Sequence, residues 1–128
     1  MAVDDGAFFI DGDSEEQTVR VKRMLKELGV RRDSKGFGIL ADAVVYSLRG
    51  DEVHGRLTKD IYPTVAKMRK QSEASVEKAC RDSVRKCWQR GNREMFRDIL
   101  GGAPRLFRGE PTVCEFLTAV RDYLDEAA

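Results

Sequence analysis

Residues 72–88 read SEASVEKACRDSVRKCW, and two kinds of residue interleave in this stretch at helical spacing. On a helix, the apolar residues fall on one stripe of the kind that packs inward: Val76, Cys80, Val84, Cys87 and Trp88. The charged residues recur at similar steps on the other side: Glu77, Lys78, Arg81, Asp82 and Arg85. This pattern predicts an amphipathic helix. The simplest interpretation of its charged face is a solvated surface of salt-bridged side chains, so any function for it needs further support.

Length and composition bound the architecture. The 128 residues, 41% of them hydrophobic, suffice for one compact core and are too few for two ordinary domains. We expect a single helical domain over residues 14–128, preceded by a flexible acidic tail over residues 1–13. No apolar run approaches the roughly 20 residues of a membrane helix, and the N-terminus MAVDDGAFFIDGD lacks the basic segment and cleavage site of a secretory signal. The sequence therefore predicts a cytoplasmic protein that does not contact a membrane.

The net charge of +1 averages over unlike segments. Residues 1–16 carry six carboxylates and no Lys or Arg, whereas residues 56–110 carry fourteen Lys or Arg against seven Asp or Glu. The distribution of charge matters more than its sum when nucleic-acid binding is considered. The stretch at 72–88 lies inside the basic segment, which favours an anionic partner.

Apolar residues recur at steps of three and four along the chain, and no run alternates as a strand does, which predicts an all-α fold of about six helices. The first helix is predicted from Ser14, which forms a capping box with Gln17, to a stop at Gly29. The second spans about residues 37–48, with Gly36 and Gly38 weakening its start. A third region spans about residues 58–70, and Pro63 either starts or interrupts it.

The stretch at 72–88 forms the fourth predicted helix, with Ser72 as N-cap and Gly91 after its end. Asn92 caps a short helix through Leu100, and a loop follows. Thr112 and Glu115 form a second capping box for a last helix ending near residue 127. A short turn joins the third and fourth helices, so residues 58–90 have the layout of a helix-turn-helix. Such pairs are common in all-α domains, and this layout alone leaves DNA binding open.

Catalytic and metal-binding patterns are absent from the sequence. The three cysteines, Cys80, Cys87 and Cys114, form no C-x-x-C pair, and buried reduced thiols are expected. The single histidine, His54, has no Cys, Asp or Glu at zinc-like spacing. The sequence holds no phosphate-binding glycine loop, nucleophile with a base, or carboxylate dyad. We therefore expect no enzymatic activity, no catalytic residues, no metal site and no cofactor.

Several short motifs occur in a familiar order: LGV at 28–30, KGF at 35–37, YPTVAK at 62–67, WQRGN at 88–92 and PTVCEF at 111–116. With these motifs, the chain from about residue 19 to its end resembles the C-terminal DNA-binding effector domain of the stage-zero sporulation protein A family, response regulators that start sporulation. The resemblance implies a six-helix bundle with an embedded helix-turn-helix. It further implies a transcription regulator whose recognition helix, residues 72–88 here, enters the major groove of double-stranded DNA.

The family's base-reading positions correspond here to Ser75, Glu77, Lys78, Arg81 and Asp82. Glu77 and Arg81 match the family type, and such side chains accept from a cytosine amino group or bridge guanine. Ser75 stands where the family usually has arginine, and Asp82 where it usually has histidine, which leaves sequence specificity open. Other residues at the ends or flanks of the helix are placed to hold phosphates: Lys70, Ser72, Arg85, Lys86 and Arg90.

The family protein also carries a phosphorylated receiver domain, for which this chain has no room. We expect a standalone homologue rather than an excised domain. The resemblance implies a contact with RNA polymerase around residues 93–108 and pairing of adjacent domains on tandem DNA sites through residues 112–127. One alternative stays open: a degenerate family member that acts as a protein-interaction module or antagonist of a full-length regulator.

Overall fold

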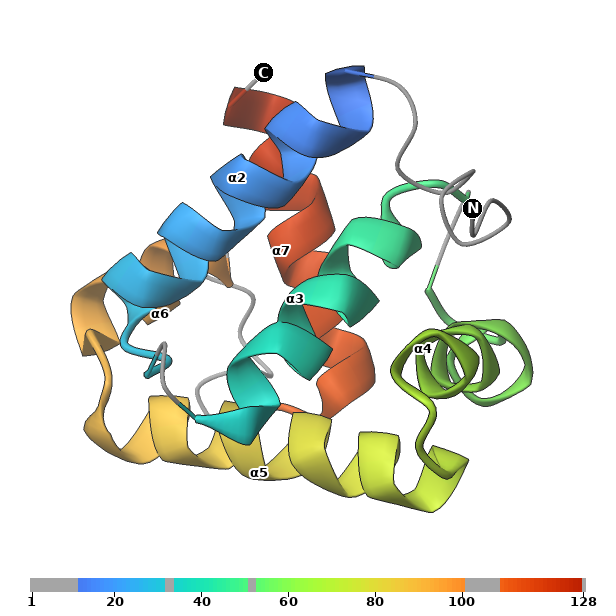
Figure 1. The fold of residues 1–128 in the computed structure, drawn as a ribbon. Helices are drawn as coiled ribbons and strands as arrows, with labels where there is room; N and C mark the ends of the chain where they lie inside the picture. Colours follow the sequence, from blue (N-terminus) through green and yellow to red (C-terminus); the bar gives the residue numbers. More distant parts are fainter. Residues whose placement is uncertain (1–11, 32–33, 51–52, 101–108, 128) are drawn as a thin grey trace.

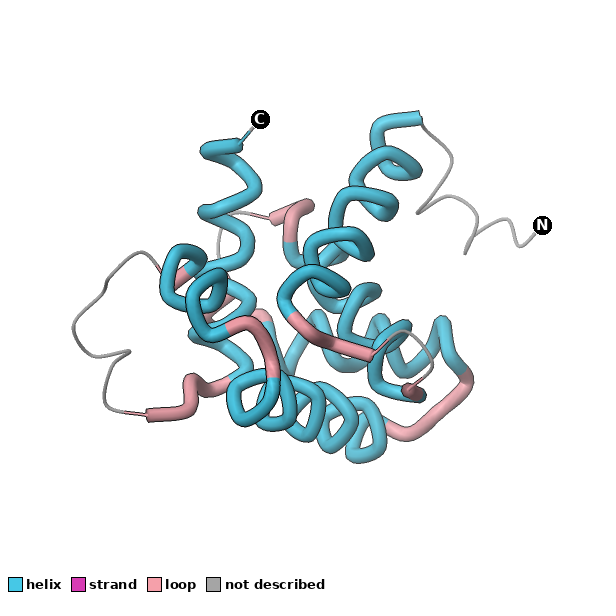
Figure 2. Tube along the Cα trace, turned by 90° about the vertical axis from the view of Figure 1, so that its left-hand side faces the viewer, coloured by secondary structure: helices cyan, strands magenta, loops and turns pink. Residues whose placement is uncertain are grey.

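The computed structural model describes residues 12–31, 34–50, 53–100 and 109–127. Within these ranges the chain forms six α-helices and one π-helical segment, with no strand, so the all-α prediction is confirmed (Figure 1). The elements are α2 (Gly12–Leu28), α3 (Lys35–Ser47), η1 (Leu57–Ile61), α4 (Tyr62–Arg69), α5 (Glu73–Arg90), α6 (Arg93–Ile99) and α7 (Val113–Ala127). Two perpendicular views show α5 at one edge of the bundle, with the other helices to one side of it (Figures 1 and 2).

The buried apolar side chains form one continuous cluster to which all six helices contribute. The apolar stripe of α5 is buried at Val76, Cys80, Val84 and Cys87. The stripes of α2 and α7 are buried as well: Val21, Leu25 and Leu28, and Val113, Phe116, Leu117, Val120 and Leu124. Trp88 is half-buried and meets Phe96 of α6 edge to face, with ring centroids 5.4 Å apart. Full burial of a Leu or Phe side chain contributes about 1.5–3 kcal/mol, so these stripes hold the helices together. None of the described helices is long and apolar enough to cross a membrane.

The predicted caps are largely confirmed. Gly29 has φ +115 and ends α2, and the Asn92 side chain accepts a hydrogen bond from the Met95 backbone N–H at 3.0 Å. At α7 the capping box is complete: the Glu115 N–H donates to Thr112 Oγ1 at 3.1 Å, and the Thr112 N–H donates to Glu115 Oε1 at 2.9 Å. The helix α2 begins at Gly12, two residues before the predicted start at Ser14, and residues 1–11 lie outside the described residues.

The beginning of α3 also differs from the prediction. The helix starts at Lys35, two residues earlier than predicted, and includes Gly36 and Gly38. A Cβ atom built on Gly36 would lie 2.0 Å from Ser83 Oγ and 3.2 Å from the carbonyl oxygen of Ala79, both in α5. At the point where α3 crosses α5, the two helices are too close for a side chain at position 36, so only glycine fits. This packing outweighs the weak helix propensity of glycine.

The region around Pro63 changes its hydrogen bonding rather than breaking. The five residues of η1 form a π-helical segment, in which the Ile61 N–H donates to the carbonyl of Arg56 at 2.9 Å, and α4 follows directly. Pro63 lies in the first turn of α4, where its missing N–H costs little. Lys70 ends α4 in the left-handed region at φ 55, and residues 70–72 turn the chain into α5.

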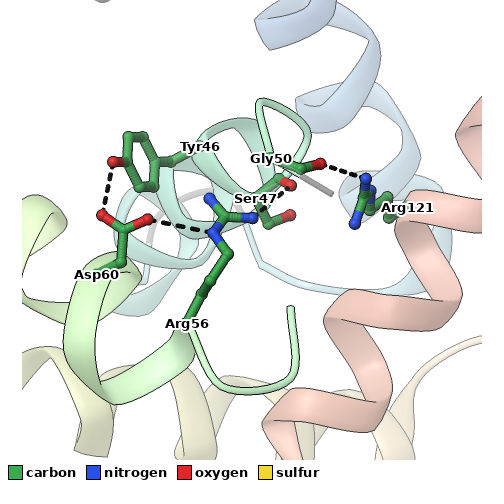
Figure 3. Close-up of polar contacts among 6 residues, drawn as sticks. All are labelled: Tyr46, Ser47, Gly50, Arg56, Asp60 and Arg121. Atoms are coloured by element: carbon green, nitrogen blue, oxygen red, sulfur yellow. Dashed lines mark hydrogen bonds and ion pairs between the residues drawn. The ribbon is translucent and has the colours of Figure 1, made fainter. Parts of the chain in front are cut away.

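A polar cluster ties η1 and α7 to the end of α3 (Figure 3). The Tyr46 hydroxyl donates to Asp60 Oδ1 at 2.7 Å, and Arg56 Nε donates to Asp60 Oδ2 at 3.2 Å. Arg121 of α7 donates to the carbonyl oxygen of Gly50. These contacts join three segments at the C-terminal end of α3, whereas the N-terminal part of α3 lies against α5.

Candidate nucleic-acid interface

The exposed face of α5 carries most of the side chains predicted to read bases. Ser75, Glu77, Lys78 and Arg81 are exposed, and Asp82 is half-buried at the edge of the same face. Two further exposed residues, Ala74 and Gln89, share this face and were missed by the sequence analysis. Helical spacing alone could have indicated both residues. Ala74 lies four residues before Lys78, and Gln89 lies four residues after Arg85, so both fall on the same side of the helix. The face is thus longer than the charge pattern indicated.

Two ion pairs run along this face, each joining residues four apart. Lys78 Nζ lies 3.0 Å from Asp82 Oδ2, and Arg81 Nη1 lies 3.5 Å from Glu77 Oε2. The hydrogen bond from Lys78 is the main reason that the pKa of Asp82 is lowered, so this carboxylate stays ionised near neutral pH. Exposed pairs of this kind contribute little to stability, so an incoming partner can separate them at low cost.

The predicted phosphate-holding residues lie around the ends and sides of α5. Lys70, Arg85, Lys86 and Arg90 are exposed, and Arg85 Nε lies 3.6 Å from Glu110 Oε2. Ser72 has a structural role in addition. Its Oγ accepts from the Ser75 N–H at 3.1 Å and donates to Ser75 Oγ at 3.0 Å, so the hydroxyl already caps α5 in the free protein.

Each end of α5 is fixed by a specific contact. Near the N-terminal end, Arg69 Nε donates to Asp42 Oδ2 at 2.6 Å, which joins the last turn of α4 to α3. At the C-terminal end, the Asn92 N–H donates to the carbonyl oxygen of Leu28 at 2.8 Å. The Cys87 thiol donates to the same carbonyl oxygen at 3.5 Å. The presentation of the charged face thus depends on α2, α3 and α4.

A groove of about 860 Å³ lies between one side of α5 and the segment that runs from Gly29 into α3. Its basic lining residues are Arg31, Lys35, Arg69, Lys78, Lys86 and Arg90. Asp82 is the only carboxylate among the described residues that line it. Three of these basic residues, at positions 31, 35 and 69, were missed. Arg31 and Lys35 are distant from α5 in the sequence, and Arg69, four residues before Glu73, is positioned by its contact with Asp42 of α3. We refer to this feature as the basic groove.

The other side of α5 differs in charge. A smaller hollow of about 360 Å³ separates α5 from η1 and the start of α7, and its charged lining residues among those described are Glu77, Arg81 and Glu110. Tyr62, Cys114, two threonines and several apolar side chains also line it. One flank of α5 is therefore strongly basic, whereas the other carries more carboxylates than guanidinium groups.

The two fully buried thiols, those of Cys80 and Cys87, are unreactive near neutral pH. Burial raises the pKa of both Cys80 and Cys87 to about 12, so both stay protonated and un-nucleophilic near neutral pH. Cys114 is only half-buried, which corrects the prediction that all three thiols are buried. Trp88 is covered by Arg93, whose guanidinium carbon lies 4.3 Å from the ring centroid, so its indole is not presented for stacking on a base.

A family model described as sporulation initiation factor Spo0A C terminal matches residues 21–124. The match includes every described helix apart from the first residues of α2 and the last of α7, and it confirms the resemblance drawn from the short motifs.

Proposed function

The chain belongs to the sporulation initiation factor Spo0A C-terminal family, whose members are DNA-binding transcriptional activator domains, and from this we propose that it regulates transcription by sequence-specific binding of DNA. In this proposal α4, the turn at 70–72 and α5 form the helix-turn-helix. The helix α5 enters the major groove as the recognition helix.

One observation carries this proposal. The 18-residue helix α5 packs only its apolar stripe on the core and leaves a charged face exposed at the edge of the bundle. A major groove about 12 Å wide admits one α-helix with its side chains, provided that neighbouring elements do not stand in the way. The position of α5 at the edge of the bundle supports such an approach.

The side chains of α5 and its flanks would have different roles in DNA binding according to their position. Arg81 and Glu77 lie where base edges would be met, and Lys78 adds a charge on the same face. Arg81 has the planar fork that bridges guanine O6 and N7, whereas Lys78 offers a point charge. Lys70, Lys86 and Arg90 lie toward the ends and the basic flank, where phosphate contacts set orientation without reading sequence.

This division of roles is tested with two variants. Arg81→Ala is expected to weaken binding to a duplex carrying the family's promoter element by about 1–3 kcal/mol, with little effect on a scrambled duplex. Lys70→Ala is expected to weaken both duplexes alike and to reduce the salt dependence. Fluorescence anisotropy at several salt concentrations measures both. Equal losses on the two duplexes for both variants would refute the assignment of base reading to Arg81.

A second candidate function rests on the ion pairs of α5. Glu77 forms an ion pair with Arg81, and Asp82 forms one with Lys78, so these four charges of the exposed face neutralise one another within the protein. Such a face also suits a protein-interaction module that antagonises a full-length regulator. In that case the purified chain would bind promoter and scrambled duplexes equally and weakly, and it would form a complex with a full-length family member in sedimentation. A preference of about 10³-fold for the promoter duplex would exclude this candidate.

Two partner assignments follow from the family and remain proposals. Helix α7 would pair adjacent domains on tandem DNA sites, and the region 93–108 would contact RNA polymerase. Of the latter region, residues 101–108 lie outside the described residues. Sedimentation with duplexes carrying one or two sites tests the first assignment: cooperative loading on two sites alone supports pairing, and independent loading argues against it.

A further inference from the structure

The two flanks of α5 differ in charge, and this difference distinguishes the sides on which a DNA strand could lie. Among the residues that the structure describes, six basic side chains and Asp82 line the basic groove, whereas Arg81 and two carboxylates are the charged residues that line the opposite hollow. A strand of DNA carries one negative charge per phosphate, so it is attracted to the first flank and not to the second.

The basic groove has two walls that come from distant parts of the chain. One wall is α5, and the other is formed by residues 29–39. Gly36 of α3 faces Ala79 and Ser83 of α5 on the floor between them, whereas Gly38 lies against the guanidinium of Arg69. Gly36, which allows the two helices to cross closely, therefore also keeps this part of the floor free of a larger side chain.

Several cations in the basic groove are available for a ligand. Lys78 is paired with Asp82, and Arg69 is paired with Asp42. By contrast, Lys35, Lys86 and Arg90 form no ion pair with any residue that the structure describes. Lys35 and Lys86 stand on opposite walls, so a polyanion in the groove would meet positive charge from both sides.

We propose that the basic groove holds the sugar-phosphate backbone of one DNA strand, and that Lys35 contacts a phosphate from the α3 wall. This inference rests on the proposed function, since it describes how the strand bordering the major groove would lie once α5 has entered. The protein would then grip that strand between α5 and the start of α3, with the phosphates balanced by charges from both walls.

The length of the groove favours a strand over a compact anion. Its lining includes both Ser72 and Arg90, which stand at opposite ends of α5. Eighteen residues of helix rise about 27 Å, and one strand of B-DNA advances only about 3.4 Å along the axis per phosphate. An extended polyanion can therefore meet cations along the whole groove, whereas a compact polyphosphate would reach only a part of them.

The experiment compares salt dependence in matched lysine variants of the full chain. Lys35→Gln is expected to lower the slope of log K against log salt by about 0.9, as expected for one lost phosphate contact. It should weaken promoter and scrambled duplexes by the same factor, and Lys35→Glu should weaken both further. Lys22→Gln is the matched control, because Lys22 is an exposed helical lysine that does not line the basic groove. That variant should keep the original slope.

The outcomes separate this inference from the proposed function. If the wild-type chain prefers the promoter duplex and Arg81→Ala abolishes that preference, while both Lys35 variants keep the wild-type slope, the groove inference is wrong and the function stands. If the wild-type chain binds no duplex, both fail. Inorganic tripolyphosphate is titrated in parallel at constant ionic strength. Binding that is lost in Lys35→Gln, together with unchanged duplex binding, would identify a compact-anion site and overturn the assignment to a strand.

Discussion

At the scale of single residues, the negative charge of Asp82 is the feature least favourable to the proposed binding of DNA. Asp82 is the only carboxylate among the described residues that line the basic groove, and its hydrogen bond from Lys78 keeps it ionised. We predict that Asp82→Asn tightens DNA binding, because it removes a repulsive charge and releases Lys78 to a phosphate. The slope of log K against log salt should steepen by about 0.9 for one additional phosphate contact, as measured by anisotropy on both duplexes.

A control variant separates a local effect of Asp82 from a change in net charge. Asp122→Asn alters the charge equally on α7, where Asp122 is exposed and lines neither the basic groove nor the opposite hollow. It should leave the slope unchanged. If Asp82→Asn behaves as Asp122→Asn does, then DNA does not approach this side of α5.

The buried thiols give the protein a dependence of stability on alkaline pH. Burial raises the pKa of Cys80 and Cys87 to about 12, whereas in the unfolded chain a thiol ionises near about 8.5. Between these values the unfolded state binds fewer protons than the folded state. The free energy of unfolding is therefore expected to be unaffected by these thiols below about pH 8. Above about pH 9 it should fall by about 1.4 kcal/mol per pH unit for each thiol.

Urea unfolding across this pH range measures the effect. Burial also raises the pKa of Tyr62, which adds to the decline above about pH 10. The variant with Cys80→Ala and Cys87→Ala keeps Tyr62 and is the appropriate control, because only the contribution of the thiols is removed. An equally steep decline in that variant would show that the thiols are not responsible.

At the scale of helices, the junction between α2 and α5 depends on Gly91. A Cβ atom on Gly91 would lie 2.4 Å from the carbonyl oxygen of Leu28 and 2.5 Å from that of Cys87. These are backbone atoms, so a rotamer change relieves neither clash. We predict that Gly91→Ala lowers the free energy of unfolding by about 3 kcal/mol, at the upper end of overpacking effects, as measured by urea unfolding.

Gly55→Ala provides the matched comparison for this junction. Gly55 has φ +88, and a Cβ atom there would meet nothing within 4 Å, so its substitution carries backbone strain without a clash. The expected cost is about 1–2 kcal/mol. A loss for Gly91→Ala no greater than that for Gly55→Ala would mean that the junction can open without penalty.

The helices themselves were predictable because their signals are local. Ser72 and Asn92 were predicted as N-caps, and Thr112 with Glu115 as a capping box of residues three apart, and the structure confirms each. The predictions were wrong where packing overrode local preference. Gly36, which is predicted to weaken the start of α3, lies inside the helix because α5 crosses α3 too closely there for a larger side chain.

At the scale of the whole molecule, the uneven charge distribution makes a prediction about the N-terminal residues. Residues 1–11 contain Asp4, Asp5 and Asp11 and no basic residue, so their removal raises the formal net charge from +1 to +4. If these carboxylates compete with DNA phosphates for the basic surface, deletion of residues 1–11 will tighten DNA binding at low salt and have little effect at high salt. Anisotropy at two salt concentrations measures this.

A length-matched variant completes this test. Substitution of Asp4, Asp5 and Asp11 by Asn preserves the chain and removes only the charge. It should reproduce the effect of the deletion if charge is the cause. If neither change alters DNA binding, the N-terminal carboxylates do not compete with DNA phosphates for the basic surface.

The basic groove could not be predicted at this scale from the sequence alone. The exposed face of α5 follows from helical periodicity within 18 residues, so most of its side chains were named in advance. Lys35 and Arg69 join that surface only through the crossing of α3 on α5 and through the ion pair of Arg69 with Asp42. The place of Lys35 on this surface, and the Asp42 partner that positions Arg69, both depend on packing of α3 against segments distant in sequence, which one sequence does not encode in any short motif.

The contact between Gly29 and Gly91 also determines how α5 can move. With a Cβ on Gly29 only 2.6 Å from the Cα of Gly91, the backbones touch, so this end of α5 would be the fixed point of any small rotation of the helix. Ser75 is 16 residues from Gly91, or about 24 Å along the helix. A rotation of about 5° around this point would therefore carry Ser75 through about 2 Å and leave Arg90 almost in place. Any such rotation would thus move the residues proposed to read bases, and Lys70 and Ser72 beyond them, while Arg90 next to Gly91 keeps its position.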